Sequence, residues 1–282
     1  MVTRSGTPRH KVSLTPTQRT LLLTLHARVV DAQRPEPIVN DTRAAEVLDQ
    51  VEHDISDIQS EGSPQMVLLL RARQLDDWTA EFVANNPEAT ILHLACGLDS
   101  RCLRVKWGGP NVRWIDVDFP DVVDLRNHVY EKPGDGADYQ LVPGDVTDGE
   151  WLKQIPNDRP TAVVFEGLTP YLTEETGTDL IRRLVDHFGI GGQLIFDTVG
   201  PVTLRLQRFL KPVKKAGASF TWGVDDPNAL AELHPRLKLR DCMRPPEMNG
   251  FDRVPLPLRV TMTAYRHLPY FRNLGLYLRY EF

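Results

Sequence analysis

Four positions that suit ligand binding follow short apolar runs in the middle of the chain. They are Gly97 after residues 91–96, Asp118 at the end of 112–118, Asp145 with Val146 after 139–144, and Glu166 within 162–167. Glycine lets a ligand approach the backbone because it has no Cβ atom, and an acid ending the next strand can accept hydrogen bonds from both hydroxyls of a ribose. The turn at Gly144-Asp145-Val146 suits an adenine edge. This spacing predicts a nucleoside-binding site.

Other ligand-binding motifs do not occur in the sequence. The dinucleotide fingerprint GxGxxG needs three glycines where the turn at Gly97 has one, and there is no phosphate loop of the form GxxxxGK[ST]. The three cysteines, Cys96, Cys102 and Cys242, form no CxxC pair and no Cys/His spacing suited to zinc. We therefore expect neither a disulfide framework nor a metal site.

A parallel sheet would bring these positions together. Apolar runs at residues 91–96, 112–118, 139–145, 162–167 and 193–198 alternate with segments that suit helices. Such alternation predicts an α/β fold with a doubly wound, mostly parallel sheet, covered on both faces, and a ligand crevice at the carboxyl ends of its strands. Residues 237–243 and 276–282 predict a late antiparallel strand pair at one edge, which brings the sheet to seven strands.

Helical periodicity dominates the first part of the chain. Apolar residues recur at helical spacing between Thr15 and Ala84. We interpret residues 1–84 as an N-terminal helical cap and residues 85–282 as the catalytic core, in one integrated domain. The segment of about 199–235 suits helix and loop, with a turn at Thr221-Trp222-Gly223, and we expect it to fold over the crevice as a lid.

Length and composition place the chain among ordinary globular proteins. Its 282 residues carry 33 Lys and Arg against 38 Asp and Glu, and 41% are hydrophobic, which argues against disorder and allows one large core with an internal pocket. The formal charge of −5 argues against a nucleic-acid partner. No run approaches the roughly 20 apolar residues that span a bilayer, and the polar start lacks a secretory segment. We expect no membrane partner and a cytoplasmic location.

The sequence resembles the leucine carboxyl methyltransferase family of S-adenosylmethionine-dependent enzymes, and within it the polyketide-tailoring branch typified by the tetracenomycin carboxyl O-methyltransferase. The likeness runs over nearly the whole chain and is carried by the segments KVSLTPTQRTLL, LRARQLDDW, ACGLDSR, IDVDFPDVVDLR, GDV, FEGLTPYLTEE, SFTWGVDDP and LYLRYEF. It implies a Rossmann-like class I methyltransferase fold, S-adenosyl-L-methionine as the cofactor with S-adenosyl-L-homocysteine as its product, and no metal.

The resemblance also implies roles for individual residues. The cofactor-binding residues would be Lys11 and Arg71 at the methionine carboxylate, Gly97 under that amino-acid moiety, Asp118 at the ribose, and Asp145 with Val146 beside the adenine. Glu166 resembles the acid beside the sulfonium and its amino group, and Tyr171 resembles a pocket residue just beyond it, so these two are the candidate catalytic residues. The pair Ala95-Cys96 departs from the Gly-Ala pair that is usual in the family.

The residues themselves leave structural alternatives open. Arg71 could simply pair with an aspartate of its own helix. We expect Asp116 and Asp118 to point to opposite faces of their strand, so that at most one faces the nucleoside, and position favours Asp118. Cys96 and His93 lie in an apolar run, and we interpret them as core residues rather than as a nucleophile and a base.

Methyl transfer from a sulfonium is an in-line displacement that needs placement of the reactants but no metal and no covalent intermediate. A carboxylic acid is ionised at neutral pH, whereas a phenol with a pKa near 10 needs a base. The motifs place no histidine at the site, which favours a carboxylate acceptor on a small polyketide-like or aromatic metabolite. Phenolic O-methylation, methylation of a protein C-terminal carboxyl group and a non-catalytic cofactor-binding scaffold are the alternatives.

Overall fold

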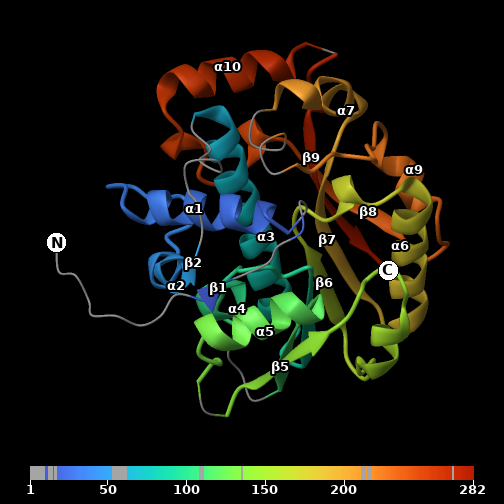
Figure 1. Cartoon of the computed structure of the whole chain (residues 1–282). Coiled ribbons are helices and arrows are strands. Elements are labelled where there is room, and N and C mark those ends of the chain that lie inside the picture. The colour runs from blue at the N-terminus through green and yellow to red at the C-terminus, as the bar shows by residue number, and fades with distance from the viewer. Residues whose placement is uncertain are drawn as a thin grey trace.

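The computed structural model describes residues 10–11, 15, 18–52, 62–107, 111–134, 136–210, 214, 217–268 and 270–282. Its centre is a seven-stranded sheet with the strand order β5-β4-β3-β6-β7-β9-β8 (Figure 1). The strands are β3 (Ala89–Leu94), β4 (Val112–Asp118), β5 (Asp138–Pro143), β6 (Thr161–Phe165), β7 (Gly192–Val199), β8 (Lys238–Met243) and β9 (Gly275–Glu281). The first five strands are parallel, and β9 runs antiparallel between β7 and β8. The predicted fold class and the late antiparallel pair are confirmed.

Helices cover both faces of the sheet, because alternate residues of the buried strands point to opposite sides. On one face, Leu92 and Leu94 belong to the core that includes α6 (Glu174–His187). On the other face, Ile91 belongs to the core of α3 (Ser63–Asn85) and α10 (Leu256–Arg266). Figure 1 shows α6 on one side of the sheet and α3 on the other. The shorter helices are α4 (Arg101–Arg104), α5 (Pro120–Val129), α7 (Pro201–Leu206) and α9 (Pro227–Ala231).

The N-terminal helices form a third, smaller core beside the sheet. Helices α1 (Thr20–Ala32) and α2 (Ala44–Gln50) pack their leucines and valines against α5. A two-stranded parallel ladder, β1 (His10–Lys11) with β2 (Val51–Glu52), lies next to them. The division into a cap and a core at residue 84 stays a prediction, whereas the helical character of the described part of this region is observed.

Local sequence signals explain where the principal helices begin. The hydroxyl of Thr173 accepts a hydrogen bond from the amide of Thr176 at 3.2 Å and so caps α6. Pro64 stands in the first turn of α3 and Pro257 in the first turn of α10, where a missing amide hydrogen costs nothing. Helix α10 begins between Pro255 and Pro257 and was not predicted. Within the described residues, no helix has the length and apolar character needed to cross a membrane.

Candidate functional site

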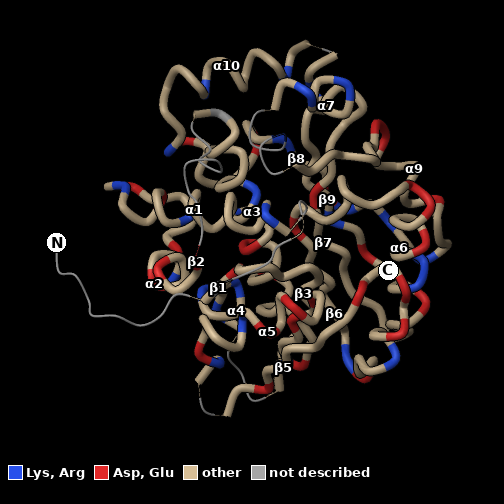
Figure 2. The backbone as a smooth tube through the Cα atoms, viewed as in Figure 1, with Lys and Arg blue, Asp and Glu red and all other residues tan. Residues whose placement is uncertain are grey.

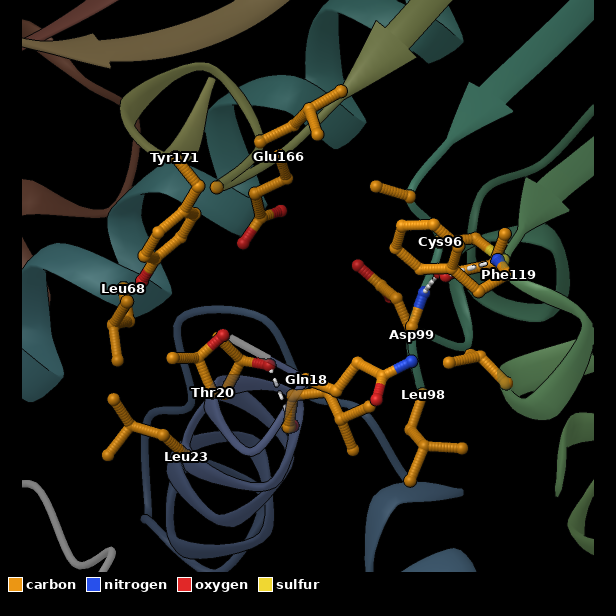
Figure 3. Close-up of a pocket in the computed structure, with 18 of the residues that line it drawn as sticks. Gln18, Thr20, Leu23, Leu68, Cys96, Leu98, Asp99, Phe119, Glu166 and Tyr171 are labelled. Atoms are coloured by element: carbon orange, nitrogen blue, oxygen red, sulfur yellow. Dashed lines mark hydrogen bonds between the residues drawn. The ribbon is translucent and has the colours of Figure 1, made fainter. Parts of the chain in front are cut away.

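A cavity of about 230 Å³ opens at the carboxyl ends of β4, β3 and β6, beneath α1. Its described lining residues come from segments far apart in the chain: Thr15, Gln18, Thr20, Leu21, Leu23, Thr24, Arg28, Leu68, Arg71, His93, Ala95, Cys96, Gly97, Leu98, Asp99, Asp118, Phe119, Val122, Glu166, Gly167, Leu168, Tyr171 and Phe220. Figure 3 shows Cys96 and Phe119 at one end, Tyr171, Leu68 and Leu23 at the other, and Glu166 projecting between them. We call the end near β4 the polar end, because Asp118 lies there, and the end near Tyr171, Leu68 and Leu23 the apolar end.

The turn after β3 forms the floor of the polar end. Gly97 has a φ of 51°, and an added Cβ would lie 3.4 Å from the Cβ of Leu21 in α1. Ala95 also has a positive φ, 49°, which costs a residue with a Cβ about 1–2 kcal/mol. Ala95 stands where the resemblance described above implies a glycine. The Cys96 side chain is buried, and burial holds the pKa of its thiol well above the usual range, so Cys96 is the inert residue that was expected.

Two buried arginines donate hydrogen bonds to the backbone of this turn. Arg126 of α5 donates from Nη1 to the carbonyls of Gly97 and Asp99, both at 2.8 Å. Arg28 of α1 donates from Nη2 to the carbonyl of Leu98 at 2.8 Å. Because carbonyl groups in a turn have no strand partner, these donors satisfy groups that would otherwise be buried and unpaired. The turn is thereby fixed from α5 and from α1 at once.

Asp118 faces the polar end of the cavity at the tip of β4. One carboxylate oxygen accepts the amide hydrogen of Gly97 at 2.7 Å and the other accepts that of Phe119 at 2.8 Å. Burial raises the pKa of the carboxyl group, although these two amides oppose the shift. Each oxygen keeps a second acceptor position, so the group can still take two hydroxyl donors from the cavity. Phe119 beside it lines the cavity and is 42% exposed, so its ring is accessible to a ligand.

Asp116 does not line the described cavity, whereas Asp118 does. The expectation that the two side chains point to opposite faces is wrong, because residues two apart in a strand share a face. What distinguishes Asp118 is its place as the last residue of β4. Its oxygens accept hydrogen bonds from Trp114 at 2.7 Å, Arg126 at 2.6 Å and Tyr139 at 2.8 Å, and one of them meets His93 at 3.1 Å. Burial alone would raise the pKa of Asp116, but Arg126 and His93 lower it to about 2. Asp116 is therefore a structural carboxylate that anchors the sheet to α5.

Glu166 lies at the tip of β6 between two guanidinium groups. Arg71 of α3 donates from Nε to one oxygen at 3.0 Å, and Arg101 of α4 donates from Nη2 to the other at 2.5 Å. Burial would raise the pKa of Glu166, yet the two arginines hold it below its usual value. Figure 2 shows basic and acidic segments next to each other around α3 and α4, where these ion pairs lie. Glu166 is an ionised carboxylate with a fixed orientation.

Arg71 joins the tips of β6 and β7. Besides Glu166, it binds Asp197 of β7 through Nη1 at 3.0 Å. The main chain makes room for it, because a Cβ on Gly167, which has a φ of 64°, would lie 3.3 Å from Nη2 of Arg71. The alternative pairing within α3 is wrong, since its aspartates at positions 76 and 77 pair with Arg101, Arg104 and Arg73 instead.

His93 is satisfied on both sides of its ring. Its Nδ1 lies 3.1 Å from Asp116, and its Nε2 lies 3.1 Å from Nη1 of Arg101. Arginine can only donate, so Nε2 must accept and the proton must sit on Nδ1. Although His93 reaches the cavity lining, neither nitrogen is free to take a proton from a ligand.

The apolar end of the cavity is bounded by η2 (Thr169–Tyr171) and by the segment around Phe220. The ring centroids of Tyr171 and Phe220 are 5.3 Å apart, with the planes inclined by 59°. Burial raises the pKa of Tyr171, although a hydrogen bond with the Thr20 side chain opposes the shift. The phenol is therefore a neutral hydrogen-bonding group at physiological pH.

The structure brings together most of the residues that the sequence singled out. Arg71, Gly97, Asp118, Glu166 and Tyr171 all line the one cavity. The side chain of Lys11 lies outside the described residues.

Asp145 and Val146 are absent from the described lining, although they follow β5 at the same edge of the sheet. Asp145 accepts hydrogen bonds from the amide and hydroxyl of Thr147, and Val146 is buried in the core. Phe119 and Phe220 were missed. Phe119 had a signal in its place directly after Asp118, and Phe220 had one in its place within SFTWGVDDP, a segment that carries the resemblance.

The fold is that of a class I S-adenosylmethionine-dependent methyltransferase, because the antiparallel β9 is inserted between β7 and β8 in an otherwise parallel seven-stranded sheet. The leucine carboxyl methyltransferase family model matches residues 22–185. The chain belongs to this family and is an S-adenosylmethionine-dependent O-methyltransferase.

Two relatives and one solved structure illustrate the kinship. The tetracenomycin polyketide synthesis O-methyltransferase TcmP of Streptomyces glaucescens is 40% identical over 231 residues, which is 82% of this chain and 83% of the relative. The S-adenosyl-L-methionine-dependent methyltransferase dpfgK of Gibberella zeae is 40% identical over 249 residues, 83% of this chain and 84% of the relative. A candidate methyltransferase from Thermobifida fusca YX shares the fold with a TM-score of 0.56 at 16% identity, over 90% of this chain and 93% of its own. The predicted family, enzyme class and cofactor are confirmed.

Proposed function

We propose that this enzyme transfers a methyl group to a carboxylate of a small, aromatic, polyketide-like metabolite. The observation that carries the proposal is the state of the titratable groups in the described cavity lining. Glu166 is held by two arginines, His93 has both nitrogens engaged, and the Tyr171 phenol has a raised pKa. Asp99 is likewise committed to Arg104, and the arginines around it hold the pKa of its carboxyl group well below its usual range, although burial opposes them.

Within the described lining, these groups leave no free base at the apolar end, since the remaining carboxylate, Asp118, lies at the polar end beside Gly97. A phenol with a pKa near 10 would cost about 4 kcal/mol to deprotonate at pH 7, and that cost would fall on the transfer step. A carboxylate of pKa about 4 is already the nucleophile. The acceptor chemistry that this cavity supports is therefore ester formation.

The residues at the polar end suit the cofactor. Gly97 leaves room for a methionine moiety, Asp118 offers two acceptor positions for the ribose hydroxyls, and the exposed ring of Phe119 offers an apolar surface for a base. Arg71, with Lys11, would hold the methionine carboxylate, Glu166 the amino group, and Asp145 with Val146 the adenine edge. When bound, the cofactor supplies an activated methyl group.

The chain's own contribution to the reaction is placement. The glycine turn is fixed by hydrogen bonds from Arg126, and Glu166 and Arg71 are fixed by buried ion pairs, so ligand binding needs little reorganisation. Holding two reactants in line can lower a barrier by about 7–11 kcal/mol. Tyr171 and its apolar neighbours would exclude water and orient the acceptor carboxylate toward the methyl group. The described lining includes residues of α1 and of the segment around Phe220, which cover the cavity and favour a small acceptor over a protein C-terminus.

Cofactor binding tests the polar end. By isothermal titration, Asp118→Ala should weaken S-adenosyl-L-methionine binding by at least about 100-fold, because two hydrogen bonds to a charged group contribute about 1.5–3 kcal/mol each. Arg71→Ala should weaken it by about 10-fold or more. The matched control is Arg73→Ala, which removes an arginine of the same helix whose described partners are Asp77 and the Ile38 carbonyl. Equal affinities in wild type, Asp118→Ala and Arg71→Ala would refute the assigned site.

The pH profile tests the acceptor. With a panel of aromatic acids and phenols, kcat/KM should be flat between about pH 6 and 9 for a carboxylate, and it would rise tenfold per pH unit for a phenol without a base. The product should be lost in mild alkali, as an ester is and an aryl ether is not. A base-stable product, or turnover confined to phenols, would replace the carboxylate with a phenolic acceptor.

A further inference from the structure

We propose that Gln207 is a positioning residue that holds Phe220 against Tyr171 to form an aromatic corner, and that this corner selects acceptors with a planar aromatic ring. The aromatic corner is the pair Tyr171 and Phe220. The inference rests on the proposed function only in taking the apolar end of the cavity as the acceptor site.

The two rings of the aromatic corner contact each other and present inclined faces to the cavity, so a ligand ring cannot insert between them. The rings of Tyr171 and Phe220 lie 5.3 Å apart at 59° to each other, and both line the cavity. Two rings at this distance touch and leave no space for a third between them. An aromatic ligand would instead meet the two inclined faces from the cavity side, where edge-to-face and offset contacts are favourable. A puckered saturated ring gains no such contact.

Phe220 cannot owe its position to regular secondary structure. It lies in a described stretch, residues 218–224, without helix or strand, so its backbone groups have no ladder partner. Gln207, the first residue of η3 (Gln207–Phe209), supplies both partners. Its Oε1 accepts the Phe220 amide at 2.7 Å and its Nε2 donates to the Phe220 carbonyl at 3.0 Å. The Gln207 side chain thus satisfies both backbone groups of Phe220, as a neighbouring strand would in a sheet.

The next two residues are fixed independently of Gln207. The amide of Thr221 donates to the Pro170 carbonyl at 2.7 Å and its hydroxyl to the Leu172 carbonyl at 2.6 Å, on either side of Tyr171. Trp222 is buried against α6, where a Cβ on Gly177 would lie 2.1 Å from its ring. These contacts tie the segment to the fold without orienting Phe220.

The orientation of the Phe220 ring and the attachment of its segment to the fold therefore depend on different residues. The contacts of Thr221 and Trp222 account for the attachment of the segment, whereas the two hydrogen bonds of Gln207 act on the residue whose ring faces the cavity. Removing the Gln207 amide should therefore release the Phe220 ring while the segment stays attached. The expected consequence is a loss of affinity for planar acceptors, with cofactor binding unchanged.

Binding of small acids in the presence of S-adenosyl-L-homocysteine tests the inference, with isothermal titration as the readout. The planar probe is anthraquinone-2-carboxylate and its saturated counterpart is cyclohexanecarboxylate. Phe220→Leu should weaken the planar acid by about 3- to 10-fold and leave the saturated acid unchanged. Gln207→Ala should do the same, and Gln207→Ala with Phe220→Leu should lose no more than Phe220→Leu alone, since Gln207 acts through that ring.

Two matched control variants distinguish an effect on the aromatic corner from a general loss of structure. Phe209→Leu makes the same change at a ring that is 65% exposed in the same part of the chain. Gln50→Ala removes a glutamine that likewise makes two hydrogen bonds to backbone groups, both donated, to the Glu46 and Val129 carbonyls, and that is not among the described lining residues of the cavity. Both should bind the two acids as wild type does. If Gln207→Ala fails to fold, Phe220→Leu still tests the aromatic selection.

Failure of the inference and failure of the proposed function have different signatures. Equal binding of the planar acid by wild type and Phe220→Leu, or an additive loss in the double variant, overturns the corner even if the wild type esterifies aromatic acids. Loss of planar binding in both single variants supports the corner even if the wild type methylates no carboxylate, in which case the proposed acceptor chemistry is wrong.

Discussion

Replacing Arg101 by methionine should destabilise the protein far more than the same replacement of a surface arginine. Arg101 is completely buried. Its guanidinium binds Asp76 through Nε at 2.7 Å, Glu166 through Nη2 at 2.5 Å and the His93 ring through Nη1 at 3.1 Å. Methionine fills a similar volume but offers none of these donors. The carboxylates would stay buried with fewer partners.

The expected loss in the free energy of unfolding depends on the partners that Glu166 and Asp76 keep. Removing one partner of a buried ion pair costs about 3–5 kcal/mol, because the other charge is left without compensation. Here Glu166 keeps Arg71 and Asp76 keeps Arg104, so we expect the lower end, about 3 kcal/mol. For a chain of 282 residues, an unfolding entropy of about 0.6 kcal/mol/K turns this into a fall in Tm of about 5 °C. Against a total stability of about 5–15 kcal/mol, the change is large.

Arg113→Met is the matched control, since Arg113 also pairs with two carboxylates. Its Nε lies 3.1 Å from Asp138 and its Nη1 lies 2.9 Å from Asp158, whose side chains are 41% and 53% exposed. Water can solvate both acids once the arginine is gone, so the loss should stay below about 1 kcal/mol. Urea unfolding followed by circular dichroism measures both variants. Equal losses, or a gain in stability for Arg101→Met, would refute the reasoning from burial.

Two further changes test other parts of the fold. Asp116, whose pKa is lowered to about 2, stabilises the folded state above the unfolded pKa of about 4, and this stabilisation, about 2 kcal/mol, is lost as the pH falls toward 2. In urea titrations, the difference in free energy of unfolding between wild type and Asp116→Asn should therefore become smaller as the pH falls from 5 to 2. A difference that does not change with pH would contradict an ionised Asp116. Gly177→Ala places a Cβ 2.1 Å from the ring of Trp222 and should lower stability by about 1–3 kcal/mol in a thermal melt, while Gly189→Ala, with open space around it, should have little effect.

Much of this fold could be predicted because the parallel strands are buried on both faces. Such strands must be apolar throughout, so the runs at residues 91–96 and 162–167 stand out from the sequence and coincide with β3 and β6. Once the strands are known, their tips must meet, and Gly97, Asp118 and Glu166 do line one cavity. These positions were predictable because their spacing is set by the sheet.

Features that depend on distant side chains were beyond the reach of the sequence. A turn was expected at Thr221-Trp222-Gly223, but the structure has an irregular segment held by hydrogen bonds to Pro170 and Leu172. No local pattern shows that Gln207, thirteen residues upstream, supplies the backbone partners of Phe220. Helix α10 was missed because two prolines at its start resemble a loop until their place in the first turn is known.

The departure at Ala95-Cys96 shows which part of the glycine turn is under the strictest geometric demand. Ala95 adopts a positive φ despite its Cβ, so this position tolerates a side chain at some cost in strain. Gly97 is different, because its own amide binds Asp118 and its carbonyl binds Arg126, while α1 packs directly over it. The partners of Gly97 come from β4, α5 and α1, and none of them depends on the residue type at position 95 or 96. The turn can therefore lose a glycine at its start and keep the geometry that faces the cavity.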